Sequence, residues 1–413
     1  MKIALVNYRY FISGGPERYF FNIKEVLERM GHEVVVFSVK GPKNFPSPYE
    51  EYFLESVGDE EYFANTRKTP ANVVKSFSRM FYSSEAKAKF RRLLEDTKPD
   101  LVYIMQYHNK ISPSIIGVAK SMGIPVVHRI SDFQYMCPNA LFYNERSGVC
   151  EDCLNGKSLS CVKYKCVMNS SIYSAIKLGA KKFHELMKIP QKIDAFIVPS
   201  SFTLSKLVKY GIKPEKLHHI PTFFNLKGQE ADPSYESFFL YVGRIEQQKG
   251  LQTLVDAFVG TDYRLKIIGF SNNGFEDELK KRIEGKPHHI EFLGKMSFDR
   301  IVPYLNTCRC TVVPSEWYDN FPNSILESFA FSKAVIATDF GSLPELVINN
   351  VTGLTFEYGS VEGLRRCIKL MHDNPSEAER MGKEARKRIE TAFNPDTHYA
   401  ELIKVFNDLV NKS

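Results

Sequence analysis

The chain has 413 residues, too many for one ordinary hydrophobic core and enough for two domains. Its composition, 43% hydrophobic and 25% charged, is that of a soluble globular protein, and no uninterrupted apolar run approaches the roughly 20 residues that a membrane-spanning helix needs. The net charge of +7 is uneven: residues 1–225 hold 32 Lys and Arg against 21 Asp and Glu, or +11, whereas the remainder holds 23 against 27, or −4. This distribution argues against nucleic acid as a partner, since a nucleic-acid binder more often has a contiguous basic face or a known motif.

The first forty residues predict a strand, a loop, a helix and a second strand. Lys2–Asn7 and Val34–Ser38 are apolar runs typical of buried strands, and Glu17–Met30 has helical periodicity. Gly31 is a helix stop signal. The turn Gly14-Gly15-Pro16 lies at the carboxyl end of the first strand, which is the edge where open α/β sheets bind ligands.

The start of the chain and its basic stretches predict a location. The apolar run at residues 1–6 is broken early by residues 8–10, so it indicates a strand rather than a signal peptide, and we expect a cytoplasmic protein. Ser84–Leu94 and Ile176–Lys192 predict basic helices with apolar residues between the charges. Such helices fit an anionic membrane surface, on the inner face of the cell membrane, or serve as ordinary surface helices.

Further strands are predicted at Leu101–Met105, Val126–Ile130 and Phe196–Val198, with helical stretches between them. Five of the eight cysteines fall between the last two strands: Cys137, Cys150, Cys153, Cys161 and Cys166. In a cytosolic protein such clustering favours metal over disulfide. Four of these thiolates could enclose a structural zinc, and a reduced or redox-sensitive thiol cluster is the alternative.

The second half repeats the alternation of strands and helices after a polar linker at about 224–236. Phe238–Val242 predicts a strand, the segment 243–250 a polar loop, and the residues up to about Phe258 a helix. More short strands are predicted at Leu265–Ile268, Ile290–Leu293, Thr311–Val313 and Ala334–Ala337. This pattern predicts a second parallel sheet.

The segment 311–331 predicts a buried strand, a tight turn and a helix that opens at Pro322. Asp319 lies on the turn and Glu327 on the first turns of the helix. A helix N-terminus has free N–H groups and a partial positive charge that suit phosphate, and the two acids could bind sugar and ribose hydroxyls. The alternative is a structural one, because acidic residues in the first turn of a helix also favour its dipole.

Two doubly wound halves would place a cleft between two sheet edges. Gly14, Arg244, Gly294 and Asp319 all lie at carboxyl ends of predicted strands and could converge there. Arg244 and Lys249 would supply counter-ions to a diphosphate in such a cleft, although alone such a pair is most often part of a solvated loop.

With these motifs in place, the chain resembles the retaining nucleotide-sugar glycosyltransferases of the GT-B fold, the large family four that includes bacterial polysaccharide-building enzymes. The resemblance covers nearly the whole chain and rests on the order and spacing of short motifs. These are Ser13-Gly14-Gly15-Pro16-Glu17-Arg18, Val198-Pro199-Ser200, Tyr241-Val242-Gly243-Arg244 continuing to Lys249-Gly250, Pro314-Ser315-Glu316-Trp317-Tyr318-Asp319-Asn320, Leu343-Pro344-Glu345 and Val351-Thr352-Gly353-Leu354.

The resemblance implies a role for each matching residue. Asp319 would hold donor-sugar hydroxyls and Glu327 the ribose, while Arg244 and Lys249 would bind the donor diphosphate. The helix-start amides of Asn323, Ser324 and Ile325 would hold the same phosphates. Gly14 and Gly15 would let the backbone approach donor and acceptor closely, and Gly294, Lys295 and Met296 would bind the base. No cofactor or metal is expected for catalysis, since Arg, Lys and helix amides would neutralise the leaving diphosphate.

Two positions depart from the family pattern. Asp319 stands where the family normally has Glu, and Ser131 stands where it usually has a His near the donor sugar. His128 would point away from Ser131 in a strand, so it is a poor replacement. Asp132 is the better candidate for a polar or base-like role. The catalytic candidates are therefore Asp319, Glu327, Asp132 and Ser131.

The family also implies the domain layout. Residues 1–225 would form the acceptor-side Rossmann-like domain, with the cysteine-rich stretch at about 133–170 as an insertion. Residues 226–395 would bind the nucleotide sugar, and 396–413 would form a helix that packs back on the first domain. The implied reaction moves a sugar from a nucleoside-diphosphate donor to a hydroxyl of a glycan or lipid-linked glycan, in cell-surface polysaccharide or lipopolysaccharide assembly.

Two other functions remain alternatives. The altered Asp319 and Ser131 fit a catalytically weak or inactive protein that binds a nucleotide sugar or glycan as an assembly component. An epimerase or a phosphorylase of the same fold is a third option, but the histidines and glutamates of the first and the cofactor-bearing lysine motif of the second are not recognisable here.

Overall fold

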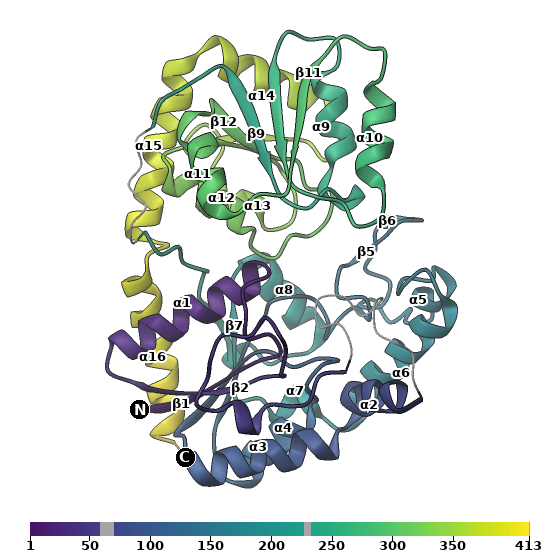
Figure 1. The fold of residues 1–413 in the computed structure, drawn as a ribbon, viewed down its shortest axis with the longest axis vertical. Helices are drawn as coiled ribbons and strands as arrows, with labels where there is room; N and C mark the ends of the chain where they lie inside the picture. Colours follow the sequence, from purple (N-terminus) through teal and green to yellow (C-terminus); the bar gives the residue numbers. More distant parts are fainter. Residues whose placement is uncertain (58–69, 227–232, 413) are drawn as a thin grey trace.

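The protein has two α/β domains, which lie one above the other in Figure 1. The computed structural model describes residues 1–57, 70–226 and 233–412. Each domain is built on a six-stranded sheet whose neighbouring strands all run parallel. The predicted fold class, two Rossmann-like doubly wound domains, is confirmed.

The N-terminal domain has the strand order β2-β1-β3-β4-β7-β8. Its strands are β1 (Lys2–Asn7), β2 (Glu33–Phe37), β3 (Leu101–Gln106), β4 (Val126–Arg129), β7 (Ala195–Val198) and β8 (Leu217–His219). A small hairpin adds β5 (Tyr143–Asn144) and β6 (Gly148–Val149). Its helices are α1 (Gly15–Arg29), α2 (Pro70–Phe81), α3 (Ser84–Thr97), α4 (Ser114–Ser121), α5 (Ser160–Lys163), α6 (Ser171–Leu186), α7 (Ile189–Lys192) and α8 (Ser201–Tyr210), with short 3₁₀ turns η1 (Glu50–Tyr52) and η3 (Pro214–Lys216).

The C-terminal domain has the strand order β11-β10-β9-β12-β13-β14. Its strands are β9 (Phe238–Val242), β10 (Arg264–Ile268), β11 (His289–Gly294), β12 (Cys310–Val313), β13 (Val335–Thr338) and β14 (Gly353–Phe356). Its helices are α9 (Leu251–Phe258), α10 (Phe275–Ile283), α11 (Phe298–Thr307), α12 (Asn323–Ala330), α13 (Leu343–Leu346), α14 (Val361–Asp373) and α15 (Pro375–Thr391), with the 3₁₀ turn η4 (Gln247–Lys249).

Each sheet is buried on both faces, which explains the continuous apolar runs of its strands. Along β1, Ala4 and Val6 join one core cluster, and Ile3 and Leu5 join another on the opposite face. The strands of the C-terminal sheet alternate in the same way between one cluster on one face and two clusters on the other. Because helices cover both faces, the carboxyl edges of the sheets are left for ligands.

The helix after Asp319 begins one residue later than predicted. Pro322 is not its first helical residue but its N-cap, in an extended conformation (φ −73°, ψ 120°), and α12 starts at Asn323. No side chain caps the amides of its first turn. A helix start without a capping side chain leaves N–H groups for another acceptor.

The last helix, α16 (Pro395–Val410), leaves the C-terminal domain and lies beside α1 of the N-terminal domain (Figure 1). Leu402, Val405 and Phe406 are buried in the same cluster as β1 and α1. The two connections between the domains meet where the amide of Phe224 donates to the carbonyl of Phe393 at 2.8 Å. The chain therefore crosses between the domains twice at one place.

Candidate active site

A cavity of 570 Å³ separates the carboxyl edges of the two sheets. The N-terminal domain contributes the glycine loop before α1 and the residues after β4. The C-terminal domain contributes the loop after β9 and the β12–α12 segment. Of the residues predicted to form the site, these line the cavity: Gly14, Gly15, Ser131, Asp132, Arg244, Lys249, Lys295, Asp319, Asn323, Ser324 and Glu327.

Three predicted residues do not line this cavity. Ile325 is fully buried in the core beneath α12, and its amide donates to the carbonyl of Pro322 at 3.2 Å, so that amide is engaged within the turn. Gly294 ends β11 in a left-handed conformation (φ +73°), and Met296 packs against the core. Between them only Lys295 reaches the cavity, with its ammonium 4.6 Å from the centre of the Phe270 ring.

Asp319 and Lys249 form a buried ion pair. The ammonium of Lys249 donates to both carboxylate oxygens of Asp319 at 2.9 Å, and the hydroxyl of Ser315 donates to one of them at 2.6 Å. The same ammonium lies 5.0 Å from the centre of the Trp317 ring. A phosphate bound by Lys249 and a hydroxyl bound by Asp319 would therefore be immediate neighbours.

Arg244 is half exposed and donates to Glu246 at 2.7 Å. Its guanidinium lines the cavity but is occupied by a carboxylate of its own loop. An exposed pair of this kind contributes little stability, so an anionic ligand could replace Glu246 at small cost.

Glu327 is paired across the cleft. Its carboxylate accepts from the guanidinium of Arg18, which belongs to the other domain and also lies 5.1 Å from the centre of the Phe298 ring. Burial raises the pKa of Glu327, and the charge of Arg18 opposes that rise. Sequence reasoning gave Arg18 no role, although it belongs to a motif already singled out; its partner lies 309 positions away.

The glycine loop touches the start of α12. A Cβ on Gly15 would lie 2.6 Å from the side-chain nitrogen of Asn323, closer than real Cβ atoms approach other heavy atoms. A Cβ on Gly14 would have Glu17 as its nearest neighbour, at 3.6 Å. A side chain at position 15 would therefore have to shift the side chain of Asn323, at the place where the helix-start amides face the cavity.

One contact within the C-terminal domain and one between the domains hold the turn that bears Asp319. The ring of Tyr318 stacks on Phe340 with centroids 4.9 Å apart, and its hydroxyl donates to Glu151 at 2.9 Å. Glu151 belongs to the N-terminal domain, between Cys150 and Cys153, and also accepts from Lys206. The cysteine-rich insertion is therefore in direct contact with the turn of the candidate donor site, which the sequence did not reveal.

Two more contacts flank that turn. The side chain of Asn320 donates to the carbonyl of Ile130 at 3.0 Å and accepts from Thr203 at 2.6 Å. Glu345, in the Leu343-Pro344-Glu345 motif, accepts from the amides of Ser201 and Phe202 at 2.8 and 2.7 Å. These amides begin α8, so a carboxylate of one domain caps a helix of the other.

The segment after β4 places Ser131 and Asp132 at the cavity wall. Ser131 accepts from Arg129 at 3.0 Å, and Asp132 accepts from the amide of Gln134 at 2.9 Å. Burial raises the pKa of Asp132 to about 6. His128 is also buried, and burial lowers its pKa to about 3, so its ring is neutral.

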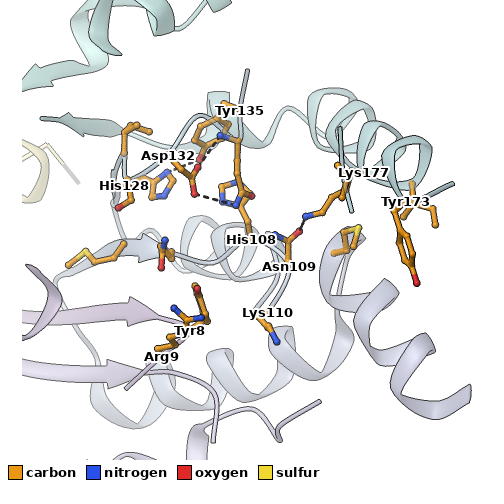
Figure 2. Close-up of a pocket in the computed structure, with 18 of the residues that line it drawn as sticks. Tyr8, Arg9, His108, Asn109, Lys110, His128, Asp132, Tyr135, Tyr173 and Lys177 are labelled. Atoms are coloured by element: carbon orange, nitrogen blue, oxygen red, sulfur yellow. Dashed lines mark hydrogen bonds between the residues drawn. The ribbon is translucent and has the colours of Figure 1, made fainter. Parts of the chain in front are cut away.

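His128 was expected to point away from Ser131, yet both line a second, smaller cavity of 380 Å³ (Figure 2). The expectation assumed a strand through Ile130, but β4 ends at Arg129 and the alternation of faces ends with it. The smaller cavity shares Tyr8, Arg9, Gln106, Ser131 and Asp132 with the cleft and extends from it into the N-terminal domain.

The five clustered cysteines, Cys137, Cys150, Cys153, Cys161 and Cys166, are all free thiols. Burial raises the pKa of Cys137 to about 11 and that of Cys166 to about 12, whereas a hydrogen bond with Cys153 lowers the pKa of Cys161. Within residues 1–57, 70–226 and 233–412, no group of three or more His, Cys, Asp or Glu is arranged to hold a metal ion. The structural zinc site therefore stays a prediction.

Comparison with known proteins gives two family matches, one in each domain. Residues 223–388 match the family "Glycosyl transferases group 1", and residues 13–146 match "Glycosyltransferase Family 4". Together the matches include the glycine loop, Asp132, Lys249, Asp319 and Glu327.

Similar sequences come from archaea and bacteria. An uncharacterized glycosyltransferase of Methanocaldococcus jannaschii is 25% identical over 81% of this chain and 90% of its own length. The D-rhamnosyltransferase WbpZ of Pseudomonas aeruginosa is 30% identical over 38% of this chain and 41% of its own length. The capsular polysaccharide biosynthesis glycosyltransferase CapM of Staphylococcus aureus is 27% identical over 42% of this chain and 46% of its own length.

Solved structures share the fold over the whole chain. Sucrose-phosphate synthase from Thermosynechococcus elongatus superposes with a TM-score of 0.71 at 20% identity and covers 100% of both chains. The Anabaena protein HepE, solved in complex with UDP-glucose, superposes with a TM-score of 0.67 at 15% identity and covers 99% of this chain and 100% of its own. At such identities the likeness concerns the fold.

Proposed function

Because this chain belongs to the group 1 and family 4 glycosyltransferases and has their GT-B fold, we propose that it transfers a sugar from a nucleoside-diphosphate donor to a hydroxyl of a glycan or lipid-linked glycan. The proposal includes retention of the anomeric configuration, no metal cofactor, and a role in cell-surface polysaccharide assembly. One observation supports it most strongly: Lys249, Asp319, Glu327 and the start of α12 meet in a single cavity between the domains.

The cavity offers a matching group for each part of such a donor. Lys249 and Arg244 would bind the diphosphate together with the first amides of α12, at Asn323 and Ser324. Glu327 would hold the ribose and Asp319 the sugar hydroxyls. The loop at Gly294, Lys295 and Met296 would face the base through Lys295. The complex of HepE with UDP-glucose supports this class of donor for the fold.

The chemistry follows from where the charge develops. The bond between the anomeric carbon and the diphosphate oxygen breaks, the acceptor oxygen attacks from the same face, and its proton passes to an oxygen of the leaving phosphate. Lys249, Arg244 and the α12 amides stabilise the charge on that leaving group, and such interactions accelerate the step because they strengthen in the transition state.

Single substitutions test the assignment. Lys249→Ala and Glu327→Ala should each lower turnover by about 100-fold or more, because each removes a group from the leaving nucleotide. Lys281→Ala, an exposed lysine on α10, is the control and should leave turnover unchanged. Release of nucleoside diphosphate measures the rate, NMR of the product gives the anomeric configuration, and an excess of EDTA should not inhibit. Near-normal transfer by both site variants would refute the proposal.

The second candidate is an assembly component that binds a nucleotide sugar without transferring it. The substitution of Asp319 and Ser131 for the usual family residues favours it, and so does the engagement of both acids in ion pairs. A thermal-shift screen of nucleoside diphosphates and their sugars finds the ligand, since a ligand at 100 times its Kd stabilises by about 2.7 kcal/mol. Binding without release of nucleoside diphosphate, even with acceptors present, would establish this second function.

We also propose contact with an anionic membrane surface, through a different face of the protein than the one that carries α3. Two of the basic residues of α3, Lys89 and Arg92, are paired with Glu55 and Glu51. The helices α2 and α6 and the segment around α5, which pack together in the N-terminal domain (Figure 1), instead expose large apolar side chains: Val74, Phe77, Leu159, Met168, Ile172 and Leu186.

Lysines at 157, 163 and 165 border these apolar side chains along the chain, which is the combination that binds anionic lipid surfaces. Within the described residues, no helix is long and apolar enough to cross a membrane. Ile172→Glu should abolish co-sedimentation with phosphatidylglycerol vesicles, whereas Leu370→Glu, an exposed leucine on α14, should not. Failure of the wild-type protein to sediment with these vesicles at low salt would exclude the contact.

A further inference from the structure

The smaller cavity extends from the donor cleft into the N-terminal domain. Its volume is 380 Å³, and Ser131 and Asp132 line both spaces. Its inner walls come from the loop after β3 and from α6, as Figure 2 shows for Asn109 and Lys177. A molecule in this cavity would therefore place one end beside the donor sugar and the other beside α6.

Lys177 projects from α6 toward the loop after β3 (Figure 2). Its ammonium donates to the side-chain oxygen of Asn109, which is neutral. Among the described residues, no carboxylate oxygen lies within the 4.0 Å of an ion pair from this nitrogen. Lys177 thus differs from Lys181 and Lys182 on the same helix, which are both paired with Glu185.

The charges around Lys177 leave its cation unbalanced. Asp132 at the mouth of the cavity is the one acid among its described lining residues, and Arg9 and Lys110 add further cations to the wall. His108 faces the same space, and burial lowers its pKa well below its usual value, so it stays neutral. His184 beside it also has a lowered pKa because of burial. Burial lowers the pKa of Lys177 to about 8, with Asp132 acting against that change.

An enclosed ammonium whose one hydrogen-bond partner among the described residues is an amide is costly to the fold. The free-energy cost of removing a charge from water is offset only by good pairing. Replacing such a charged residue by an apolar one of similar size often leaves the stability of the protein unchanged or raises it. Met80 and Ile176 line the same cavity and could pack against a long apolar side chain at position 177. The cation is therefore better explained by a ligand than by the stability of the fold.

We propose that this cavity binds the acceptor and that Lys177 selects an acceptor with an anionic group, a phosphate or a carboxylate, on or next to the sugar that is glycosylated. The inference rests on the proposed transferase function and names the class of its acceptor. Asp132 contacts the sugar at the mouth, and Tyr8, Tyr135 and Tyr173 offer apolar ring faces and hydroxyls along the walls. The anionic group reaches the ammonium of Lys177 at the inner end.

Binding of small probes tests the inference without turnover. Glucose 1-phosphate, glucuronic acid and glucose are titrated by ligand-observed NMR into the wild-type protein and into Lys249→Ala, whose donor site is impaired. We expect at least one of the two anionic sugars to bind at least tenfold more tightly than glucose in both proteins. Lys177→Met should lose this preference, whereas Lys182→Met, an exposed lysine of the same helix, should keep it.

The pH dependence provides a second readout. Below pH 8 the ammonium of Lys177 is charged, so anion binding is complete there and weakens as the pH rises above about 8. Asp132, His108, His128 and His184 do not reproduce this change, because Asp132 is already ionised above pH 6 and the histidines are neutral. Lys177→Arg keeps its charge at pH 9 and should retain the preference there.

The outcomes separate this inference from the proposed function. Equal binding of glucose and both anionic sugars, or an unchanged preference in Lys177→Met, would overturn it whether or not transfer is found. Loss of the preference in Lys249→Ala but not in Lys177→Met would place the anion in the donor cleft and also overturn it. Binding of the phosphate alone or the carboxylate alone would support it and identify the source of the charge. Lys177→Met should melt no lower than wild type, which excludes misfolding as the cause.

Discussion

At Gly15 the N-terminal domain touches the helix start that would hold the donor diphosphate. The absence of a side chain matters here because of Asn323, not because of backbone conformation: Gly14, immediately before it, is extended with φ −169°. A methyl group at position 15 has to displace the side chain of Asn323, the first residue of α12.

We therefore expect Gly15→Ala to lower turnover on the order of tenfold to a hundredfold, since a displacement of about 1 Å in a positioning element can cost that much. Gly14→Ala is the matched control, because its Cβ would meet its nearest neighbour at an ordinary 3.6 Å. Steady-state transfer rates of the two variants test this. A Gly15→Ala enzyme as fast as Gly14→Ala would show that the loop has no part in positioning the donor.

The carboxylate of Asp132 is expected to lower the stability of the fold at neutral pH. Its pKa is 3.8 in the unfolded chain and about 6 in the folded protein, because burial disfavours the charged form. Below pH 3.8 both states are protonated and the group has no effect; as the pH rises to 6, the unfolded state ionises first and the fold loses stability. Two pKa units correspond to about 3 kcal/mol.

Asp132→Asn should therefore raise the free energy of unfolding at pH 7.5, with the gain vanishing near pH 4, while acceptor turnover falls. Urea denaturation at the two pH values measures it. A variant that is less stable than wild type at pH 7.5 would mean that the ionised carboxylate is stabilised in the fold.

At the scale of elements, the cysteine-rich insertion contacts the candidate donor site through the rings of Phe133 and Phe142 and through a hydrogen bond. The hydroxyl of Tyr318 donates to Glu151 at 2.9 Å, and Glu151 is also held by Lys206. Tyr318 is the residue before Asp319, so this bond restrains the turn that presents the acid. The insertion is thus part of the wall of the site and not an appendage.

Tyr318→Phe and Glu151→Gln should each lower turnover, and the double variant should be no worse than the more affected single one. A hydrogen bond to a charged group contributes about 1.5–3 kcal/mol, so the coupling energy of the double-mutant cycle should lie near 1 kcal/mol or above. Glu145→Gln, in the same insertion, is the control. Additive effects of the two substitutions would show that the contact has no role in the site.

At the scale of the whole molecule, α16 ties the domains together. It begins after the second crossing and buries Leu402, Val405 and Phe406 against the N-terminal sheet, where the ring of Phe406 lies 5.2 Å from that of Tyr103. His398 adds a hydrogen bond to the carbonyl of Pro221, next to the first crossing. The helix therefore limits how far the two domains can separate.

Phe406→Ala should destabilise the protein by about 3–5 kcal/mol, the usual cost of a cavity left by a buried aromatic ring. Lys404→Ala, exposed on the same helix, should change stability by less than about 0.5 kcal/mol. Chemical denaturation followed by circular dichroism measures both. Equal stability of the two variants would show that α16 is not part of the folded core.

Much of the fold was predictable from local pattern. Apolar runs that alternate with helical periodicity specify parallel sheets buried on both faces, as Lys2–Asn7 and Phe238–Val242 illustrate. That Lys249, Asp319 and Glu327 face one cavity was predictable because each follows a strand or lies near a helix start; their roles in a site stay predictions. The amide of Ile325 was assigned wrongly, since the exact helix start at Asn323 decides which amides remain available.

The sequence by itself determined the α/β class, the two domains and the family motifs, because these depend on periodicities and spacings within a few tens of residues. Only the tertiary structure decided which partners those motifs meet. Arg18 and Glu327, Tyr318 and Glu151, and Lys177 and Asn109 are partners that lie far apart along the chain. Such contacts depend on how two sheets pack across a cleft, and no local pattern records that packing.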